Sequence, residues 1–159
     1  MFRKRRILQA AAAVVLIAGT SCQAYHRHKP LAGESVIAAP EMYESQEDRL
    51  LVLKHRSSLN AIYDGIRDRF SSSKLEFFLI SGICFRKFQL KSRYDTYLSI
   101  NTKCSASFND DKTTFAKRAA AVFASYSRPL LSIAASETAL LEDTDVAGIM
   151  ISTRWGVQK

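Results

Sequence analysis

The chain opens with a basic head, a short apolar stretch and a cysteine, in that order. The head is Arg3-Lys4-Arg5-Arg6, the apolar stretch runs from Ile7 to Gly19, and Cys22 follows. A positive head, an apolar middle and small residues before a cut site are the pattern of a secretory signal. We therefore expect residues 1–21 to be a signal peptide and the fold to be built from the rest of the chain.

The apolar stretch is too short for a helix that spans a membrane. It holds 13 residues, whereas such a helix needs about 20. The run Leu16-Ile17-Ala18-Gly19-Thr20-Ser21-Cys22 resembles the signal of bacterial lipoproteins. The resemblance implies that Cys22 is lipidated and becomes the mature N-terminus. The alternative is an ordinary cut after Ala24, since Cys22 and Ala24 are small residues at the positions that such a cut requires.

The lipoprotein resemblance also implies a place in the cell envelope. Gln23 follows the cysteine, and in the sorting rule of enterobacterial lipoproteins this favours the outer membrane. An ordinary cut would release the protein into the periplasm. Residues 22–43 contain Pro30, Gly33 and Pro40 without any helical or alternating pattern, which predicts a tether next to the membrane. The globular domain is then expected over residues 44–159.

The charge of the chain gives little support for a nucleic-acid role. The formal net charge is +8, and four positive charges lie in the head at Arg3-Lys4-Arg5-Arg6. The remaining 19 basic and 15 acidic residues leave an excess of +4, scattered along the chain rather than clustered. About 115 residues remain after the signal and the tether, which is enough for one hydrophobic core.

Of the three cysteines in the chain, one follows the predicted signal peptide and two lie in the predicted domain. Cys22 is consumed by lipidation or removed by the alternative cut, so Cys84 and Cys104 remain. An even number of cysteines in an oxidising compartment predicts a disulfide between them. The alternative is two reduced, buried thiols that act as small apolar residues.

Two helices are expected from apolar stripes. The first runs from residue 45 to residue 70, and the second starts near residues 109–111 and carries its stripe from Phe115 to Ile133. Pro129 falls inside the second stripe and should kink or split that helix near Ser125 to Arg128. The first stripe consists of Val52, Leu59, Ile62, Ile66 and Phe70.

Three strands complete the expected fold, over residues 75–90, 94–105 and 146–157. The order is helix, strand, strand, helix, strand. This predicts a small α+β domain in which two helices pack on one face of an antiparallel sheet. A bridge between Cys84 and Cys104 would require a hairpin loop of about seven residues, Lys91 to Tyr97.

No residue pattern in the chain identifies a catalytic centre. We expect no cofactor and no metal, since His26 and His28 lie in the tether rather than in a fixed geometry. The leading hypothesis is a non-enzymatic envelope protein that binds an envelope protein partner or serves in assembly. The last strand should turn Ile149, Ile151 and Trp155 toward the helices. If Trp155 were exposed instead, Ile151, Trp155 and Val157 would form a candidate partner surface.

Two rival hypotheses start from charged residues. The first is a small exported hydrolase that uses carboxylates of residues 137–145 as an acid/base pair. These carboxylates are Glu137, Glu142, Asp143 and Asp145. The second is a basic surface that binds nucleic acid or anionic lipid. With Lys103, four residues make the end of the hairpin basic, and the hypothesis depends on whether these four form one contiguous patch: Arg86, Lys87, Lys91 and Arg93.

Overall fold

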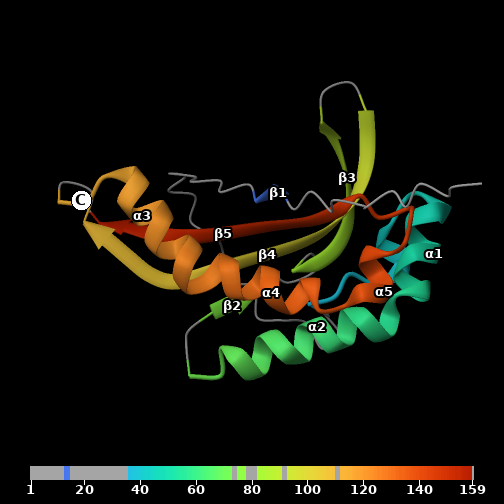
Figure 1. The fold of residues 1–159 in the computed structure, drawn as a ribbon, viewed down its shortest axis with the longest axis horizontal. Coiled ribbons are helices and arrows are strands. Elements are labelled where there is room, and N and C mark those ends of the chain that lie inside the picture. The colour runs from blue at the N-terminus through green and yellow to red at the C-terminus, as the bar shows by residue number, and fades with distance from the viewer. Residues whose placement is uncertain are drawn as a thin grey trace, which may run out of the picture.

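Helices and strands are both present in the computed structural model, which describes residues 13–14, 36–72, 75–77, 82–90, 93–109 and 112–158. They form one small domain of mixed α and β structure (Figure 1), as the sequence predicts. In chain order the elements are β1 (Ala13–Val14), the 3-10 turn η1 (Pro40–Met42), α1 (Gln46–Lys54), α2 (Arg56–Arg69), β2 (Leu75–Phe77), β3 (Ile83–Leu90), β4 (Arg93–Asn109), α3 (Phe115–Val122), the π-helical turn η2 (Phe123–Ser127), α4 (Arg128–Ala135), α5 (Thr138–Leu141) and β5 (Gly148–Gln158).

β4 is the central strand of the sheet. β5 pairs with it in parallel, from Tyr97 opposite Gly148 to Asn109 opposite Gln158. β2 and β3 both run antiparallel to it, and β1 pairs in parallel with β5. The expectation of an antiparallel sheet is therefore wrong for β5. The cause is the connection, because a crossover through helices α3 to α5 brings the next strand in parallel.

The hairpin between β3 and β4 has a tighter turn than the sequence suggested. Leu90 lies opposite Arg93, so two residues join the strands instead of the expected loop from Lys91 to Tyr97. Each residue of β3 consequently lies opposite a residue of β4 five positions earlier than expected. Phe88, for example, pairs with Asp95.

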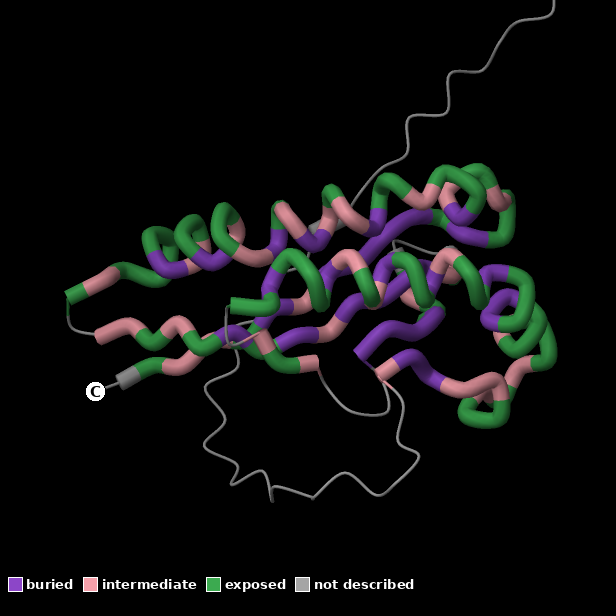
Figure 2. Tube along the Cα trace, turned by 90° about the horizontal axis from the view of Figure 1, so that it is seen from below, coloured by how far each residue is buried: buried purple, intermediate pink, exposed green. Residues whose placement is uncertain are grey.

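The hydrophobic core lies between the sheet and a layer of helices. Helices α2 and α4 lie side by side (Figure 1) and contact each other. Buried residues gather along the facing sides of helices and strands (Figure 2). Each fully buried Leu or Ile contributes roughly 1.5 to 3 kcal/mol. The core includes Leu98 and Ile100 of β4, Ile149 and Ile151 of β5, Ile62 and Ile66 of α2, and Leu130 and Ala134 of α4.

The first helical segment breaks at His55. The sequence predicts one helix from residue 45 to residue 70, whereas the structure has α1 and α2 with His55 between them at φ −101° and ψ 18°. The side chain of His55 is buried against Asp143, which no periodicity signals. Because of the break, α1 contacts β3 while α2 contacts α4.

Pro129 divides the second helical segment as the sequence predicts. Residues Phe123–Ser127 form a π-helical turn between α3 and α4, and Pro129 lies in the first turn of α4. Proline lacks a backbone N–H and clashes with the preceding turn. A wider turn accommodates it.

A chain of buried hydroxyl groups ties this turn to the sheet. Oγ1 of Thr153 lies 3.1 Å from Oγ of Ser127 and accepts a hydrogen bond of 3.3 Å from Oγ1 of Thr102. All three residues are fully buried, with none of their surface exposed. The hydroxyl of Thr102 also lies 3.4 Å from the carbonyl oxygen of Ser152, so these buried hydroxyls have hydrogen-bond partners within the protein.

The domain begins earlier than residue 44. Ile37 and Ala38 are buried, Ile37 forms a parallel bridge with Ile83, and the amide of Ala38 donates to the carbonyl of Ile83 at 2.9 Å. Residues from Val36 onward thus belong to the domain, and the predicted tether boundary at residue 43 is corrected. The β-prone run Val36-Ile37 lies between tether-like residues, which hid it in the sequence pattern.

The predicted signal peptide, residues 1–21, lies outside the described residues except for Ala13 and Val14 of β1. Cys22 and residues 23–35 of the predicted tether lie outside them as well. In the part of the chain that the structure describes, no helix has the length and apolar character needed to cross a membrane.

Candidate functional site

An open groove lies between α1 and the β3–β4 hairpin. Its volume is about 820 Å³. Side chains of α1 form one wall, and Lys87 of β3 and Tyr94 of β4 contribute to the other. Thr144 and Asp145, from the segment before β5, complete the lining. Three parts of the chain that are distant in sequence thus meet at one surface.

The apolar part of the groove comes from α1 and from Tyr94. Leu51 and Val52 are buried, whereas Leu50 and Leu53 are 57% and 60% exposed. A helix has 3.6 residues per turn, so four consecutive apolar residues cannot all face the core. Leu50 and Leu53 line the groove together with Tyr94, which is 67% exposed.

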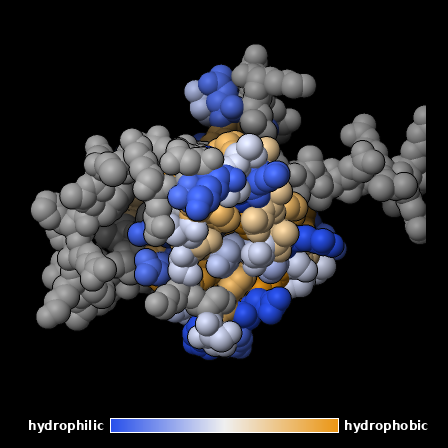
Figure 3. Space-filling model, turned by 90° about the vertical axis from the view of Figure 1, so that its left-hand side faces the viewer, coloured by the Kyte–Doolittle hydropathy of each residue, from blue (hydrophilic) through white to orange (hydrophobic). Residues whose placement is uncertain are grey.

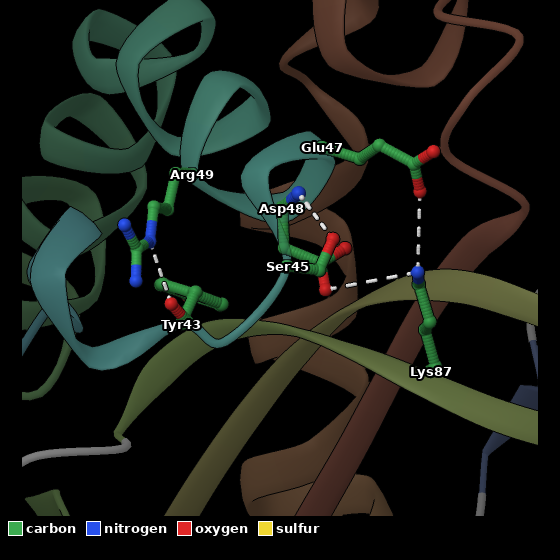
Figure 4. Close-up of polar contacts among 6 residues, drawn as sticks. All are labelled: Tyr43, Ser45, Glu47, Asp48, Arg49 and Lys87. Atoms are coloured by element: carbon green, nitrogen blue, oxygen red, sulfur yellow. Dashed lines mark hydrogen bonds and ion pairs between the residues drawn. The ribbon is translucent and has the colours of Figure 1, made fainter.

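The charged part of the groove begins at the N-terminus of α1. Ser45 caps the helix, since its Oγ accepts a hydrogen bond of 3.2 Å from the amide of Asp48. Glu47 and Asp48 occupy the first turn, where negative charge meets the positive end of the helix dipole. Lys87 of β3 reaches toward both carboxylates (Figure 4), with Nζ 3.3 Å from Oε2 of Glu47 and 4.0 Å from Oδ2 of Asp48.

Tyr43 holds the segment that precedes α1 against β3. Its hydroxyl accepts a hydrogen bond of 2.9 Å from the amide of Phe85 in β3. Burial raises the pKa of Tyr43 to about 12, so the phenol stays neutral. Arg49 donates through Nε to the carbonyl oxygen of Tyr43 at 2.7 Å (Figure 4). The start of α1 is therefore held against the strand that forms the opposite wall.

Asp48 carries negative charge that its neighbours match poorly. Its side chain is 13% exposed, and its Oδ1 is buried without a hydrogen-bond partner among the described residues. The ammonium of Lys87 stays 4.0 Å from Oδ2. A buried polar atom without a partner has lost its water without compensation, which is uncommon in folded proteins.

The lining that the structure describes is acidic, although the chain is basic. Four of the described lining residues are carboxylates and two are lysines, which is an excess of two formal negative charges. The chain has a formal charge of +8, of which four charges lie in residues 3–6. The described lining therefore differs in sign from the net charge of the chain. The charged lining residues are Glu47, Asp48, Asp95, Asp145, Lys54 and Lys87.

Asp143 links the α1–α2 junction to the segment before β5. Nε2 of His55 donates to its Oδ2 at 2.5 Å, and Nζ of Lys54 lies 2.8 Å from the same oxygen. Its Oδ1 accepts a hydrogen bond of 3.1 Å from the amide of Asp145. The hydrogen bond from Lys54, and then that from His55, hold the pKa of Asp143 well below its usual range, although burial acts in the opposite direction.

A His–Asp pair is a familiar acid/base unit, but this pair is enclosed. The side chains of His55 and Asp143 are 5% and 4% exposed, respectively, and neither residue lines the groove. A general base must come within hydrogen-bond reach of a substrate proton. The pair therefore has the geometry of an internal hydrogen-bonded contact that positions the groove walls.

The carboxylates of residues 137–145 take separate places in the structure. Asp143 makes the internal contact with His55, Asp145 is exposed and lines the groove, Glu142 is exposed, and Glu137 is half-buried beside α5. Of these four residues, only Asp145 lines the groove. The groove therefore does not bring two of these carboxylates together as an acid/base pair.

The two cysteines of the domain are buried and form no disulfide bond in the described structure. Cys84 lies opposite Ser99 of β4, whereas Cys104 lies opposite Leu75 of β2. Ser99 and Cys104 are five residues apart on one strand, or roughly 16 Å. Bridged Cα atoms must lie within about 7 Å. The predicted disulfide between Cys84 and Cys104 is therefore wrong, because the tight hairpin shifts the register. Burial raises the pKa of both thiols.

The basic residues of the hairpin do not form one patch where the structure describes them. Arg86 and Lys87 are neighbours on β3, so they point to opposite faces of the sheet. Arg86 donates through Nε to Sγ of Cys84 at 3.3 Å, while Lys87 pairs with the acidic residues of α1. Lys91 and the side chain of Arg93 lie outside the described residues.

The candidate partner surface on β5 is only partly exposed. Ile151 is fully buried, so it belongs to the core and is not part of a surface. Trp155 is half-buried and packs against Phe115 of α3, with ring centroids 5.9 Å apart. Val157 is 37% exposed and Phe115 is 50% exposed. Figure 3 views the end of the molecule that carries α3 and shows apolar residues beside hydrophilic ones there.

The orientation of β5 otherwise follows the sequence pattern. Ile149 and Ile151 are 2% and 0% exposed and belong to the core cluster with the helices, as predicted. Trp155 contacts Phe115 of α3, but it is only half-buried, whereas Ile149 and Ile151 are buried. Within the described residues, no group of His, Cys, Asp or Glu side chains is arranged to hold a metal ion.

Sequence reasoning missed the groove. Leu50 and Leu53 lie beside the apolar stripe of the first helix, and the stripe predicts only which side of that helix is buried. The available signal was the run Leu50-Leu51-Val52-Leu53 itself, because several consecutive apolar residues on a helix must expose some of them. Tyr94 and the acidic residues come from other elements, and their meeting depends on tertiary structure.

No protein-family model, curated protein or solved structure matches this chain.

Proposed function

We propose that this protein is an exported, lipid-anchored envelope protein that binds a protein partner through the groove between α1 and the β3–β4 hairpin. It acts as a binding or assembly component and not as an enzyme. The observation that carries the proposal is the exposure of three large apolar side chains, Leu50, Leu53 and Tyr94, in the lining of one groove.

Apolar groups in a groove with charged edges have the composition of a protein interface. Interfaces have an apolar core, in which aromatic residues are enriched, and a polar rim. Burying apolar surface yields about 25 cal/mol per Å². Leu50, Leu53 and Tyr94 supply such a core, and Glu47 and Asp145 supply charge around it.

The anchor rests on the lipoprotein-like signal. A lipid on Cys22 would hold the domain at a membrane, with the outer membrane favoured because Gln23 follows the cysteine. Residues 22–35 would then act as the tether, since residues from Val36 onward pack on the domain. Intact-mass analysis of protein from its native membrane tests this part. A diacyl or triacyl adduct on Cys22 is expected, and an unmodified N-terminus at Tyr25 would contradict it.

The groove is tested by site-specific photo-crosslinking in intact cells. A photoreactive residue is placed at Leu53, and a matched control is placed at Asn60, which is exposed on α2. We expect a discrete crosslinked product from position 53 that is weakened by Tyr94→Ala. Identical products at both positions, or none at position 53, would refute binding through the groove.

A further inference from the structure

We infer that the groove accepts a linear segment of a partner protein in which a basic side chain lies next to apolar side chains. The inference rests on the proposed function and specifies the chemistry of the partner. Its basis is the combination of an acidic lining with exposed leucines in a chain that is basic overall.

The first step concerns charge. Asp48 has a buried Oδ1 without a hydrogen-bond partner among the described residues, and Lys87 lies 4.0 Å from its other oxygen. Lys87 is also shared with Glu47 at 3.3 Å. The side chain of Glu47 is 85% exposed, so a guanidinium or ammonium group from a ligand can reach this carboxylate and donate charge-assisted hydrogen bonds to it. Asp145 adds a further exposed carboxylate to the lining.

The second step concerns the neighbouring apolar surface. Leu50 and Leu53 are three residues apart on α1, so they lie on one side of the helix, about one turn from each other. Glu47 lies three residues before Leu50, so it adjoins the same side of the helix. A ligand that covers both leucines therefore brings its flanking residues close to Glu47, whose side chain is 85% exposed. This favours a segment with alternating basic and apolar side chains over a purely charged one.

The sign of the charge also argues against a membrane surface as the occupant. Anionic headgroups attract basic segments, whereas the described residues of the groove lining have an excess of two formal negative charges. A second copy of this chain is disfavoured as well, because the same acidic lining would face itself across a symmetric contact.

The test uses the purified exported protein and three fluorescein-labelled peptides of one design. The first peptide alternates Arg with Leu, the second has citrulline in place of every Arg, and the third has Glu. Fluorescence anisotropy at low salt gives each affinity. We expect the Arg peptide to bind about tenfold more tightly than the citrulline peptide, which corresponds to one charge-assisted hydrogen bond, and the Glu peptide not to bind.

Matched variants locate the effect. Asp48→Asn and, separately, Asp145→Asn should reduce the preference for Arg over citrulline several-fold. Asp64→Asn, on an exposed site of α2, removes the same charge outside the groove and should leave the preference unchanged. Circular dichroism checks that each variant folds. Because the hydrogen bond to Ser45 comes from the backbone amide of Asp48, Asn at this position retains the helix cap.

Several results would overturn the inference. Equal binding of the Arg and citrulline peptides would show that charge does not select the ligand, while crosslinking at Leu53 would still support a groove partner. If no peptide bound, or if Asp48→Asn and Asp64→Asn had equal effects, a linear basic segment would be ruled out as the occupant of the groove. A Leu53-dependent dimer in analytical ultracentrifugation would identify a second copy, and Leu53-dependent binding to lipid vesicles would identify a membrane.

Discussion

Nε2 of His55 lies 2.5 Å from Oδ2 of Asp143, although 88 residues separate them in the sequence. His55 is the residue at which α1 ends and α2 begins. Asp143 belongs to the segment that also carries Asp145, a lining residue of the groove. The contact therefore fixes the position of α1 relative to another part of the groove wall.

Replacing Asp143 by Asn should destabilise the domain by about 2 to 3 kcal/mol, because a charge-assisted hydrogen bond to a buried group is lost. The side chain of Asp143 is 4% exposed, so water cannot easily take the place of its Oδ2 as the hydrogen-bond acceptor. Urea unfolding followed by circular dichroism measures the change. Asp145→Asn is the control, since Asp145 is exposed and its loss should change stability by no more than about 0.5 kcal/mol.

The stability of the protein should fall in acid because of the same carboxylate. The pKa of Asp143 is lower in the folded state than its ordinary value of 3.8, owing first to Lys54 and then to His55. A lowered folded-state pKa gives a contribution that is complete above the unfolded-state pKa and is lost as the pH falls toward the folded-state pKa. Urea midpoints measured from pH 6 down to pH 2 should therefore decrease below about pH 5. The decrease should be shallower in Asp143→Asn, and parallel curves would contradict this assignment.

The sequence predicts the elements well where a single period governs them. The stripe through Leu59, Ile62 and Ile66 placed a helix correctly, and Pro129 marked the site where the second helix is interrupted. The alternation in the last strand identified Ile149 and Ile151 as core residues. These features depend on local geometry, which neighbouring residues determine.

The features that failed depend on how elements meet. The parallel direction of β5 follows from the path of a crossover, and the break at His55 follows from a contact with Asp143. The predicted disulfide assumed one hairpin register, and a difference of five positions invalidated it. The sequence pattern did not predict the groove, because its lining comes from three separate parts of the chain.

Cys84 and Cys104 should be reduced thiols, not joined in a disulfide, that react slowly in the folded protein. Burial raises the pKa of both thiols and shields them from reagents. Alkylation with iodoacetamide, followed by mass spectrometry, should modify both residues quickly in urea and slowly in buffer. Non-reducing peptide mapping provides the check, and a peptide that links Cys84 to Cys104 would contradict the register of the hairpin.

Replacing Thr153 by Val should destabilise the domain by about 1 to 3 kcal/mol, even though valine has the same shape and is more apolar. The loss of Oγ1 leaves the buried hydroxyls of Ser127 and Thr102 with fewer hydrogen bonds. Thermal unfolding measures the effect. Thr138→Val is the matched control at an exposed site of α5, and an equal change in both variants would argue against the hydroxyl chain.

Two leucines of α1, two positions apart, should differ strongly in how much their truncation to Ala destabilises the domain. Leu51 is 6% exposed and belongs to the core, so Leu51→Ala should cost about 2 to 5 kcal/mol of unfolding free energy. Leu53 is 60% exposed, so Leu53→Ala should change stability by no more than about 0.5 kcal/mol. Urea unfolding of the two variants measures this difference within a single helix. If Leu53→Ala proved as costly as Leu51→Ala, Leu53 would be a core residue and the groove would lose its apolar wall. A stable Leu53→Ala protein that no longer binds the Arg peptide would instead separate recognition from folding at this helix.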